Sequence, residues 1–101
     1  ANDDNVNIPY VTALHKNYPN PFNPETTIHY SLSEAGPVKI EVYNIKGQLV
    51  RNLVNERKTA GNYTVIWNGK DEQGKNVSSG IYFYRMQTKN YSSTKKMMLM
   101  K

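Results

Sequence analysis

The side chains that could support acid–base or nucleophilic chemistry are few and widely spaced. His15 lies in the weakly patterned N-terminal stretch, and His29 lies in an alternating segment, on the face opposite its apolar residues. Neither histidine has a serine or carboxylate beside it in a recognisable nucleophile motif. Asp71 and Glu72 are adjacent in a run of turn-forming residues, where neighbouring side chains rarely converge on one substrate. The sequence therefore predicts a protein that is not an enzyme.

Metal and cofactor sites are also not expected. The sequence has no cysteine, which excludes disulfides, thiolate metal sites and a cysteine nucleophile. Residues 68–80 could offer calcium the oxygens of Asn68 and Asp71, but a single carboxylate is a poor calcium ligand set. A turn formed by Asp71 and Gly74 is the preferred interpretation. The glycines of this loop do not follow the phosphate-binding spacing either.

The charge balance is basic, with 13 Lys and Arg against 8 Asp and Glu, for a net charge of +5. These basic residues are scattered and lack the aromatic-flanked basic motifs of RNA-binding modules, so nucleic acid is not the expected partner. No apolar run approaches the roughly 20 residues of a membrane helix, and membrane insertion is not expected.

Alternating apolar and polar residues predict strands throughout the chain. In Thr26–Leu32, Ile28 and Tyr30 face one way and His29 and Ser31 the other. The other predicted strands cover residues 38–45, 48–54, 63–67, 81–87 and 91–101. About seven short antiparallel strands with turn residues between them predict an all-β, immunoglobulin-like β-sandwich. Trp67 is the candidate for the central aromatic residue of its core.

Two kinds of aromatic residue can be separated by strand face. Tyr43 and Phe83 are predicted to point outward and, with Tyr91, could stack on sugar rings. Tyr82 and Tyr84 share their face with apolar residues, which is more typical of a core. A carbohydrate-binding or adhesive accessory module of a secreted hydrolase is therefore the alternative function.

Three prolines in residues 17–24 (N-Y-P-N-P-F-N-P) exclude a helix and a central strand. We expect this segment to run extended along a sheet edge, with Tyr18 and Phe22 as its anchors.

The end of the sequence, K-K-M-M-L-M-K, brackets four apolar residues with lysines. We expect it to pair with a sheet up to its last residue, with either Met97 and Leu99 or Met98 and Met100 facing inward. The lysines either protect an edge strand from aggregation or belong to an address that another protein reads. Pairing of two copies through an edge strand also stays open.

Several motifs in order make the chain resemble the C-terminal sorting domain of the type IX (Por) secretion system of Bacteroidetes. They are Y-P-N-P-F-N-P-E-T-T-I at 18–28, V-Y-N-I-K-G-Q-L-V at 42–50, W-N-G-K-D-E-Q-G at 67–74, S-G-I-Y-F-Y-R-M at 79–86, and the final K-K-M-M-L-M-K. The flagellar hook-cap Ig-like domain shares part of the Trp-to-Tyr stretch, so a shared fold alone would not decide between the two.

The resemblance implies a role and a location. Residues 14–101 would be the sorting domain, and residues 1–13 a linker or a boundary within a longer protein. The domain would carry an attached N-terminal cargo protein through the periplasm and outer membrane of a Gram-negative bacterium, for secretion or surface display. Its partners would be the outer-membrane translocon and a sortase.

The resemblance also implies site residues. The recognition residues would be Gly80, Tyr82, Tyr84, Lys95, Lys96, Met97, Met98, Leu99, Met100 and Lys101. The residues that shape the fold around them would be Pro19, Asn20, Pro21, Trp67, Asp71 and Gly74. A purely structural spacer is the third interpretation, in which further protein could follow the last strand without consequence.

Overall fold

The computed structural model describes residues 10–101. The predictions for residues 1–9 lie outside the described part of the chain. Seven strands are present: β1 (Ala13–Leu14), β2 (Thr26–Leu32), β3 (Gly36–Tyr43), β4 (Leu49–Lys58), β5 (Gly61–Trp67), β6 (Gly80–Thr88) and β7 (Ser92–Leu99). All the pairings between these strands are antiparallel. The predicted all-β, immunoglobulin-like sandwich is therefore confirmed.

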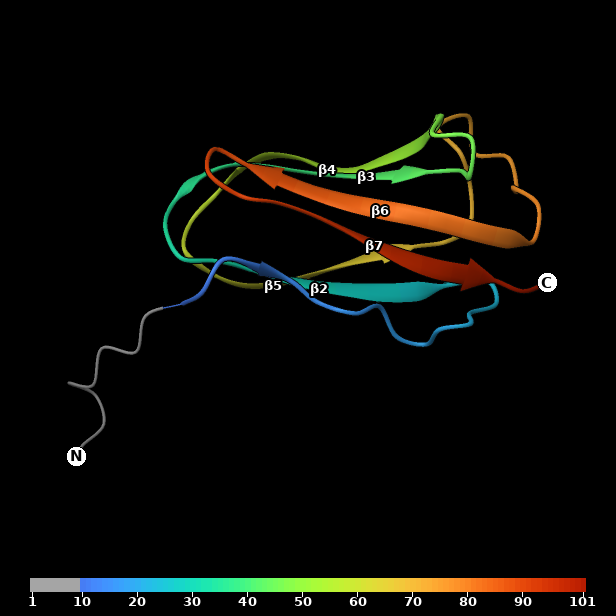
Figure 1. Cartoon of the computed structure of the whole chain (residues 1–101), viewed down its shortest axis with the longest axis horizontal. Coiled ribbons are helices and arrows are strands. Elements are labelled where there is room, and N and C mark those ends of the chain that lie inside the picture. Colours follow the sequence, from blue (N-terminus) through green and yellow to red (C-terminus); the bar gives the residue numbers. More distant parts are fainter. Residues whose placement is uncertain (1–9) are drawn as a thin grey trace.

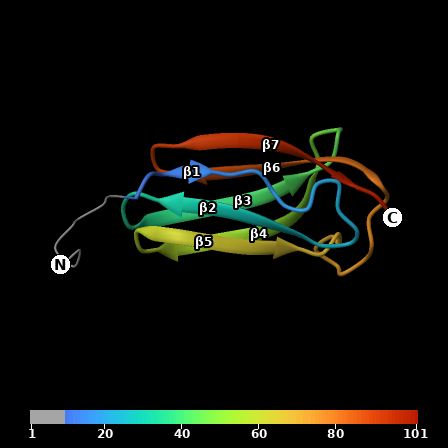
Figure 2. The same cartoon turned by 90° about the horizontal axis from the view of Figure 1, so that it is seen from below.

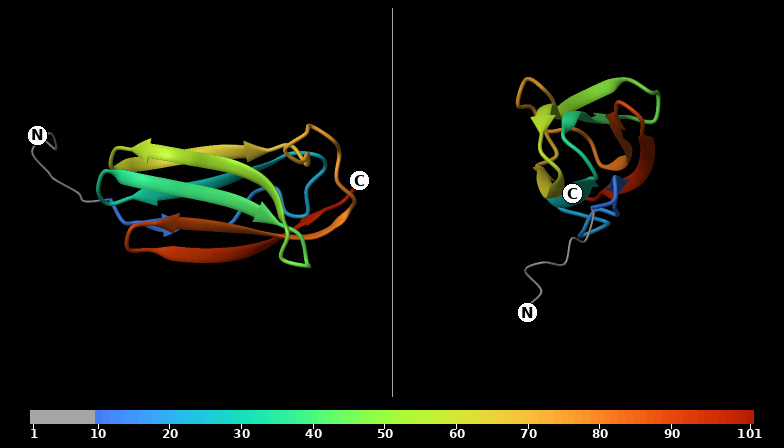
Figure 3. Two further views of the ribbon diagram at one scale, coloured as in Figure 1. Left: turned by 90° about the horizontal axis from the view of Figure 1, so that it is seen from above. Right: turned by 90° about the vertical axis from the view of Figure 1, so that its left-hand side faces the viewer.

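The strands form two layers, with β1-β2-β5 in one sheet and β4-β3-β6-β7 in the other. The two sheets lie face to face, as the side and end views show (Figures 1 and 3). Along one side of the sandwich β1 lies beside β7, and along the other β4 lies beside β5 (Figure 2). We call the first of these sides the β1–β7 seam.

The core follows from the alternation of apolar residues along the strands. Ile28 and Tyr30 of β2 and Ile40 of β3 are buried between the sheets. Trp67 is fully buried, and it packs against the tilted ring of Phe22 and edge-on against Tyr82, with ring centroids 5.6 and 5.2 Å away. These contacts are of the kind that aromatic pairs favour, and they join both sheets to the proline segment.

Ser31 departs from the simple alternation. It was expected on the outer face of β2, but it is buried, and its hydroxyl donates to the carbonyl of Val11. The chain before β1 covers it, since Thr12 is also hydrogen-bonded to Ser33. Strand pairing begins at Ala13, one residue before the domain boundary predicted at residue 14.

Several strand boundaries differ from the prediction, including the starts of β3 and β5 and both ends of β6. β3 ends at Tyr43 rather than residue 45 because the Asn44 side chain accepts from the amides of Lys46 and Gln48 and closes a turn. β4 continues past the end predicted at residue 54, because its polar residues up to Lys58 pair with β3. These polar side chains belong to an edge strand, where solvent exposure makes polarity compatible with a sheet. β7 covers Ser92–Leu99, not residues 91–101.

Candidate recognition surface around the last strand

β7 inserts one face of its side chains into the core. Met97 and Leu99 are buried, whereas Met98 and Met100 are 38% and 53% exposed. This decides between the two orientations that the sequence left open. The strand pairs with β6 without a register shift, from Gly80 opposite Leu99 to Gln87 opposite Ser92.

The proline segment covers the outer edge of β7 at its C-terminal half. The amide of Met98 donates to Oδ1 of Asn20 at 3.0 Å, and the carbonyl of Met98 accepts from the amide of Phe22 at 3.0 Å. The amide of Met100 donates to the carbonyl of Phe22 at 2.9 Å. Two sequence motifs at opposite ends of the chain therefore form one hydrogen-bonded unit, which we call the Phe22 clasp (Asn20, Phe22, Met98 and Met100).

Phe22 is the anchor of this segment, as expected, because its side chain is only 2% exposed. Tyr18 is not an anchor: its side chain is 77% exposed, and only its backbone pairs, with Thr27. Pro19 and Pro21 are both exposed. The carbonyl of Pro19 accepts from the hydroxyl of Thr26 at 2.8 Å, which ties the bend to β2.

The last two residues lie beyond β7 but are still bound to the domain. The amide of Lys101 donates to the Ser79 hydroxyl at 3.0 Å, and its Nζ donates to the carbonyl of Val77. The expectation that the strand pairs up to its last residue is thus wrong in detail, since Lys101 contacts the loop before β6 rather than a strand.

Gly80, Tyr82 and Tyr84 occupy β6, directly beside β7. Gly80 has a φ of 148°, which favours glycine at the start of this strand. Tyr82 is buried, and its hydroxyl donates to the carbonyl of Ser78 at 2.7 Å. Tyr84 is fully buried, and its hydroxyl donates to the carbonyl of His15 at 2.8 Å, across the seam. Since they are buried, the two tyrosines position β7 and the seam; their side chains are not at the surface.

The burial of Tyr84 affects the pKa of its hydroxyl. Burial raises the pKa of Tyr84 to about 12, because the phenolate would lose its hydration in this position. The hydroxyl therefore stays protonated at neutral pH and can donate its hydrogen bond to His15.

Asp71 and Gly74 form a turn at the end of the sandwich where the chain ends. Oδ1 of Asp71 accepts from the amides of Gln73 and Lys75, and Gly74 has a φ of 82°. Glu72 accepts from the amide of Asn52 on the outer edge of β4. Oδ1 of Asn68 accepts from the amide of Lys70, so a side-chain oxygen of each residue considered for calcium is hydrogen-bonded within the loop. No group of three or more His, Cys, Asp or Glu that could hold a metal occurs in residues 10–101.

The three candidate sugar-stacking residues do not form one platform. Tyr43 and Phe83 are register partners on the outer face of the four-stranded sheet. The Tyr43 hydroxyl donates to Glu41 at 2.5 Å, and the guanidinium of Arg85 lies 5.4 Å from the Tyr43 ring centroid. Tyr91 instead lies at the β1–β7 seam, where its hydroxyl accepts from the amide of Leu14 at 3.1 Å.

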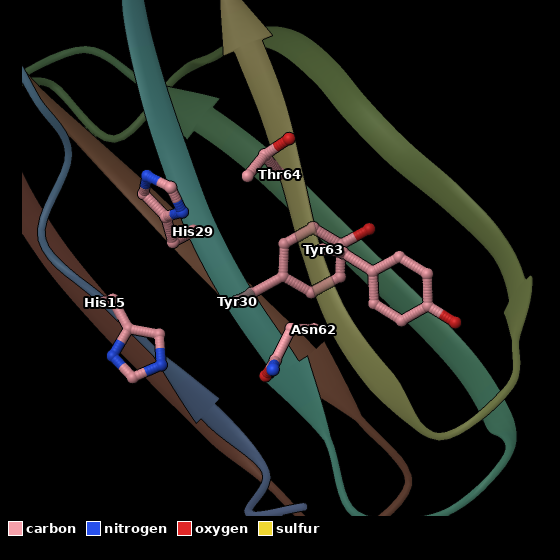
Figure 4. Close-up of a pocket in the computed structure, with 6 residues that line it drawn as sticks. All are labelled: His15, His29, Tyr30, Asn62, Tyr63 and Thr64. Carbon is pink, nitrogen blue, oxygen red and sulfur yellow. The ribbon is translucent and has the colours of Figure 1, made fainter.

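The two histidines are neighbours in the fold although they are 14 residues apart. The amide of His15 donates to the carbonyl of His29 at 2.9 Å, and both side chains line a shallow pocket with Tyr30, Asn62, Tyr63 and Thr64. Their rings do not point toward one another (Figure 4). Within residues 10–101, no carboxylate, the usual partner of a histidine base, lines this pocket.

In the part of the chain that the structure describes, nothing helical has the length and apolarity required to cross a bilayer.

Sequence reasoning missed two residues that border β7. Lys16 and Asn17 follow β1 and line a hollow together with Lys95 and Lys96. Periodicity could not place them there, because it does not reveal that the segment before the prolines runs alongside the last strand. The sole signal is their position directly before the Y-P-N-P motif.

The comparisons with known proteins agree with this fold. The family described as the FlgD Ig-like domain matches residues 23–92. The structure resembles that of dimeric latent PorU from Porphyromonas gingivalis, with a TM-score of 0.71, 20% identity and coverage of 93% of this chain and 10% of that one. It also resembles PorZ, a surface component of the type IX secretion system of the same organism, with a TM-score of 0.61, 21% identity and coverage of 87% and 11%.

A flagellar protein is similar as well. FlgD from P. aeruginosa has a TM-score of 0.58 and 26% identity, with coverage of 73% of this chain and 57% of that one. Compared with PorU and PorZ, the chain spans only about a tenth of their length. No match to a curated protein was found.

Proposed function

The chain belongs to the FlgD Ig-like domain family, and we propose that this member is a non-catalytic sorting domain of the type IX secretion system. It directs an attached cargo protein across the outer membrane to the cell surface. Its partners are the outer-membrane translocon and the sortase, and its mechanism is protein–protein recognition.

One observation carries this proposal. The proline motif and the final K-K-M-M-L-M-K motif, which define the two ends of the resemblance to sorting domains, contact each other in the Phe22 clasp. The fold likeness to PorU and PorZ is compatible with this role.

The exposed side chains near the clasp supply a surface for a partner. Met98 and Met100 are exposed while Met97 and Leu99 are buried, so the strand has one face for the core and one for solvent. Exposed apolar residues on a folded surface are typical of contact sites when they are grouped.

A secretion assay tests the proposal. The chain is fused behind a reporter with a signal peptide and expressed in a bacterium that has a type IX system. We expect surface delivery of the reporter, measured by its accessibility to added protease, and retention in the periplasm when residues 95–101 are deleted. Normal surface delivery of the deletion variant would overturn the proposal.

The deletion removes Met97 and Leu99 from the core and will also disturb folding. A second variant, Met98→Asp with Met100→Asp, changes exposed side chains only and should also trap the reporter. Ile66→Asp on β5 is the matched control, because Ile66 is 57% exposed and lies on the other sheet. Equal delivery of the double variant and the control would contradict a role for this end of the chain.

A further inference from the structure

A basic hollow lies in the β1–β7 seam, between the open part of β7 and the segment that leads from β1 to the prolines. It has a volume of about 310 Å³ and is lined by Lys16, Asn17, Asn20, Tyr84, Lys95 and Lys96. We call it the basic slot. It lies between two closures of the seam: the hydrogen bond from Leu14 to Tyr91 and the Phe22 clasp.

Within residues 10–101, the lysines of the basic slot have no acidic counterpart, because no carboxylate of this part of the chain lines it. The ion pairs found in residues 10–101 join Arg51 to Glu72, Lys58 to Glu56 and Arg85 to Glu41, and none of them includes Lys16, Lys95 or Lys96. Three positive charges around one hollow favour an anionic occupant.

The strand edge beside the slot supplies backbone donors and acceptors. Met98 directs both its amide and its carbonyl away from β6, toward the Phe22 clasp. In an antiparallel strand, the amide and carbonyl of every second residue point to the same side. The amides and carbonyls of Lys96 and Thr94 therefore also point away from β6. No backbone partner for them occurs on that side in the described chain. The edge of β7 is therefore covered at Met98 and open at residues 94–96.

We propose that the basic slot binds an extended acidic segment of a partner protein, which pairs with β7 at residues 94–96 and places its carboxylates against Lys16, Lys95 and Lys96. Strand addition gives affinity through the backbone, and the lysines select acidic side chains. A phosphate group would use the amides and lysines but leave the carbonyls without donors, so a peptide satisfies more of the site.

The length of the added strand is limited by the structure. The Phe22 clasp occupies the edge from Met98 onward, and the contact between Tyr91 and Leu14 closes the seam at the other end. This inference rests on the proposed function for the partner's role in export, but binding itself can be measured without it.

The test is a titration of the folded domain with fluorescein-labelled octapeptides, followed by fluorescence anisotropy. The probe peptide carries consecutive glutamates flanked by threonines, because Lys95 and Lys96 project to opposite faces of β7, and a matched peptide carries lysines in place of the glutamates. We expect saturable binding of the acidic peptide, weakened by added salt. Charge reversal by Lys95→Glu or Lys96→Glu should raise its dissociation constant at least about tenfold, because it replaces attraction to the peptide carboxylates by repulsion.

The backbone part of the proposal has its own variant. Lys96→Pro removes an amide that points away from β6 and is tolerated on an edge strand, so the sheet should persist while peptide binding is lost. Circular dichroism checks the fold of each variant. Lys75→Glu, in the exposed loop before β6, is the control and should leave the dissociation constant unchanged.

The inference would be overturned if the acidic peptide did not bind, or if the lysine peptide bound equally well. It would also be overturned if a glutamate–proline peptide, which cannot add as a strand, bound equally well, or if Lys96→Glu left the affinity unchanged. Binding of vesicles with anionic lipid through the same lysines, with no peptide binding, would assign the slot to a membrane surface instead. Concentration-dependent dimerisation abolished by Lys96→Pro would assign it to a second copy. Absence of peptide binding by the unaltered domain, together with normal reporter delivery, would reject the slot and leave the proposed function standing.

Discussion

The four-stranded sheet has two edge strands, β4 and β7, and a different kind of contact covers each of them. At β7 the Phe22 clasp is formed by backbone hydrogen bonds, by the neutral side chain of Asn20 and by a buried aromatic ring. At β4 the cover is the exposed carboxylate of Glu72, which accepts from the amide of Asn52 and lies 3.9 Å from Arg51. The pairing of β4 with β3 also has register shifts, whereas β7 pairs with β6 without any.

This difference indicates two ways of handling an edge. Irregular pairing and an exposed charge at β4 make that edge a poor template for another strand. β7 is regular, and within residues 10–101 the Phe22 clasp covers its edge at Met98 but leaves the outward backbone groups at residues 94–96, beside the lysines, without a backbone partner. The geometry thus concentrates the capacity for strand pairing at one place.

The largest expected effect comes from breaking the Phe22 clasp. Phe22→Ala removes a buried ring that packs on Trp67 and should lower the free energy of unfolding by about 3–5 kcal/mol. Tyr18→Ala, four residues earlier and 77% exposed, should change it by less than about 0.5 kcal/mol. Urea unfolding followed by circular dichroism measures both, and equal effects would show that the ring does not anchor the segment.

The difference between local pattern and long-range contact explains which parts of the fold could be predicted from the sequence. The alternation in β2 and β3 predicted strands and inward residues correctly, because period-2 burial is a local property of a strand. The contact between Phe22 and Leu99 has no local signature, since it joins residues far apart in the chain. β4 was predicted too short because its edge position lets polar residues continue a strand, and only the pairing with β3 reveals that position.

The candidate site follows the same rule. The buried positions of Tyr82 and Tyr84 could be predicted from the face they share with Met86. Their hydrogen bonds could not, because Tyr84 bonds to a carbonyl of the N-terminal stretch. The basic slot was missed for the same reason, since Lys16 reaches β7 only through the course of the chain after β1.

The next effect is a fall in the free energy of unfolding at high pH, which we expect to depend on Tyr84 and not on Tyr63. Burial raises the pKa of Tyr84 to about 12, above the value of about 10 for an unfolded tyrosine. Below pH 10 the phenol is protonated in both states, so its contribution to stability is fully present. Between pH 10 and 12 the unfolded chain loses this proton and the folded chain keeps it, so the free energy of unfolding should fall.

Burial also raises the pKa of Tyr30, and the hydrogen bond to Glu41 raises that of Tyr43, so these two residues contribute to the fall as well. Tyr84→Phe should therefore reduce the fall, and it should cost about 1 kcal/mol at neutral pH through the lost hydrogen bond to His15. Tyr63→Phe is the matched change on the other side, where the Tyr63 hydroxyl donates to the exposed carbonyl of Thr59 at 2.6 Å. That variant should keep the fall above pH 10. The measurement is urea unfolding between pH 8 and 11.5, and an unchanged pH slope in Tyr84→Phe would contradict the assignment to Tyr84.

The smallest effect separates the two edge contacts by their response to salt. Asn20→Ala removes a neutral acceptor from the amide of Met98 and should cost about 0.5–1 kcal/mol at any ionic strength. Glu72→Gln keeps an acceptor for Asn52 but removes the charge near Arg51, so its cost should stay below about 0.5 kcal/mol and vanish in 1 M salt. Urea unfolding at low and high salt measures both variants. A salt-dependent cost for Asn20→Ala would mean that charge, not backbone pairing, holds the covered half of β7, and the distinction between the two edges would then be lost.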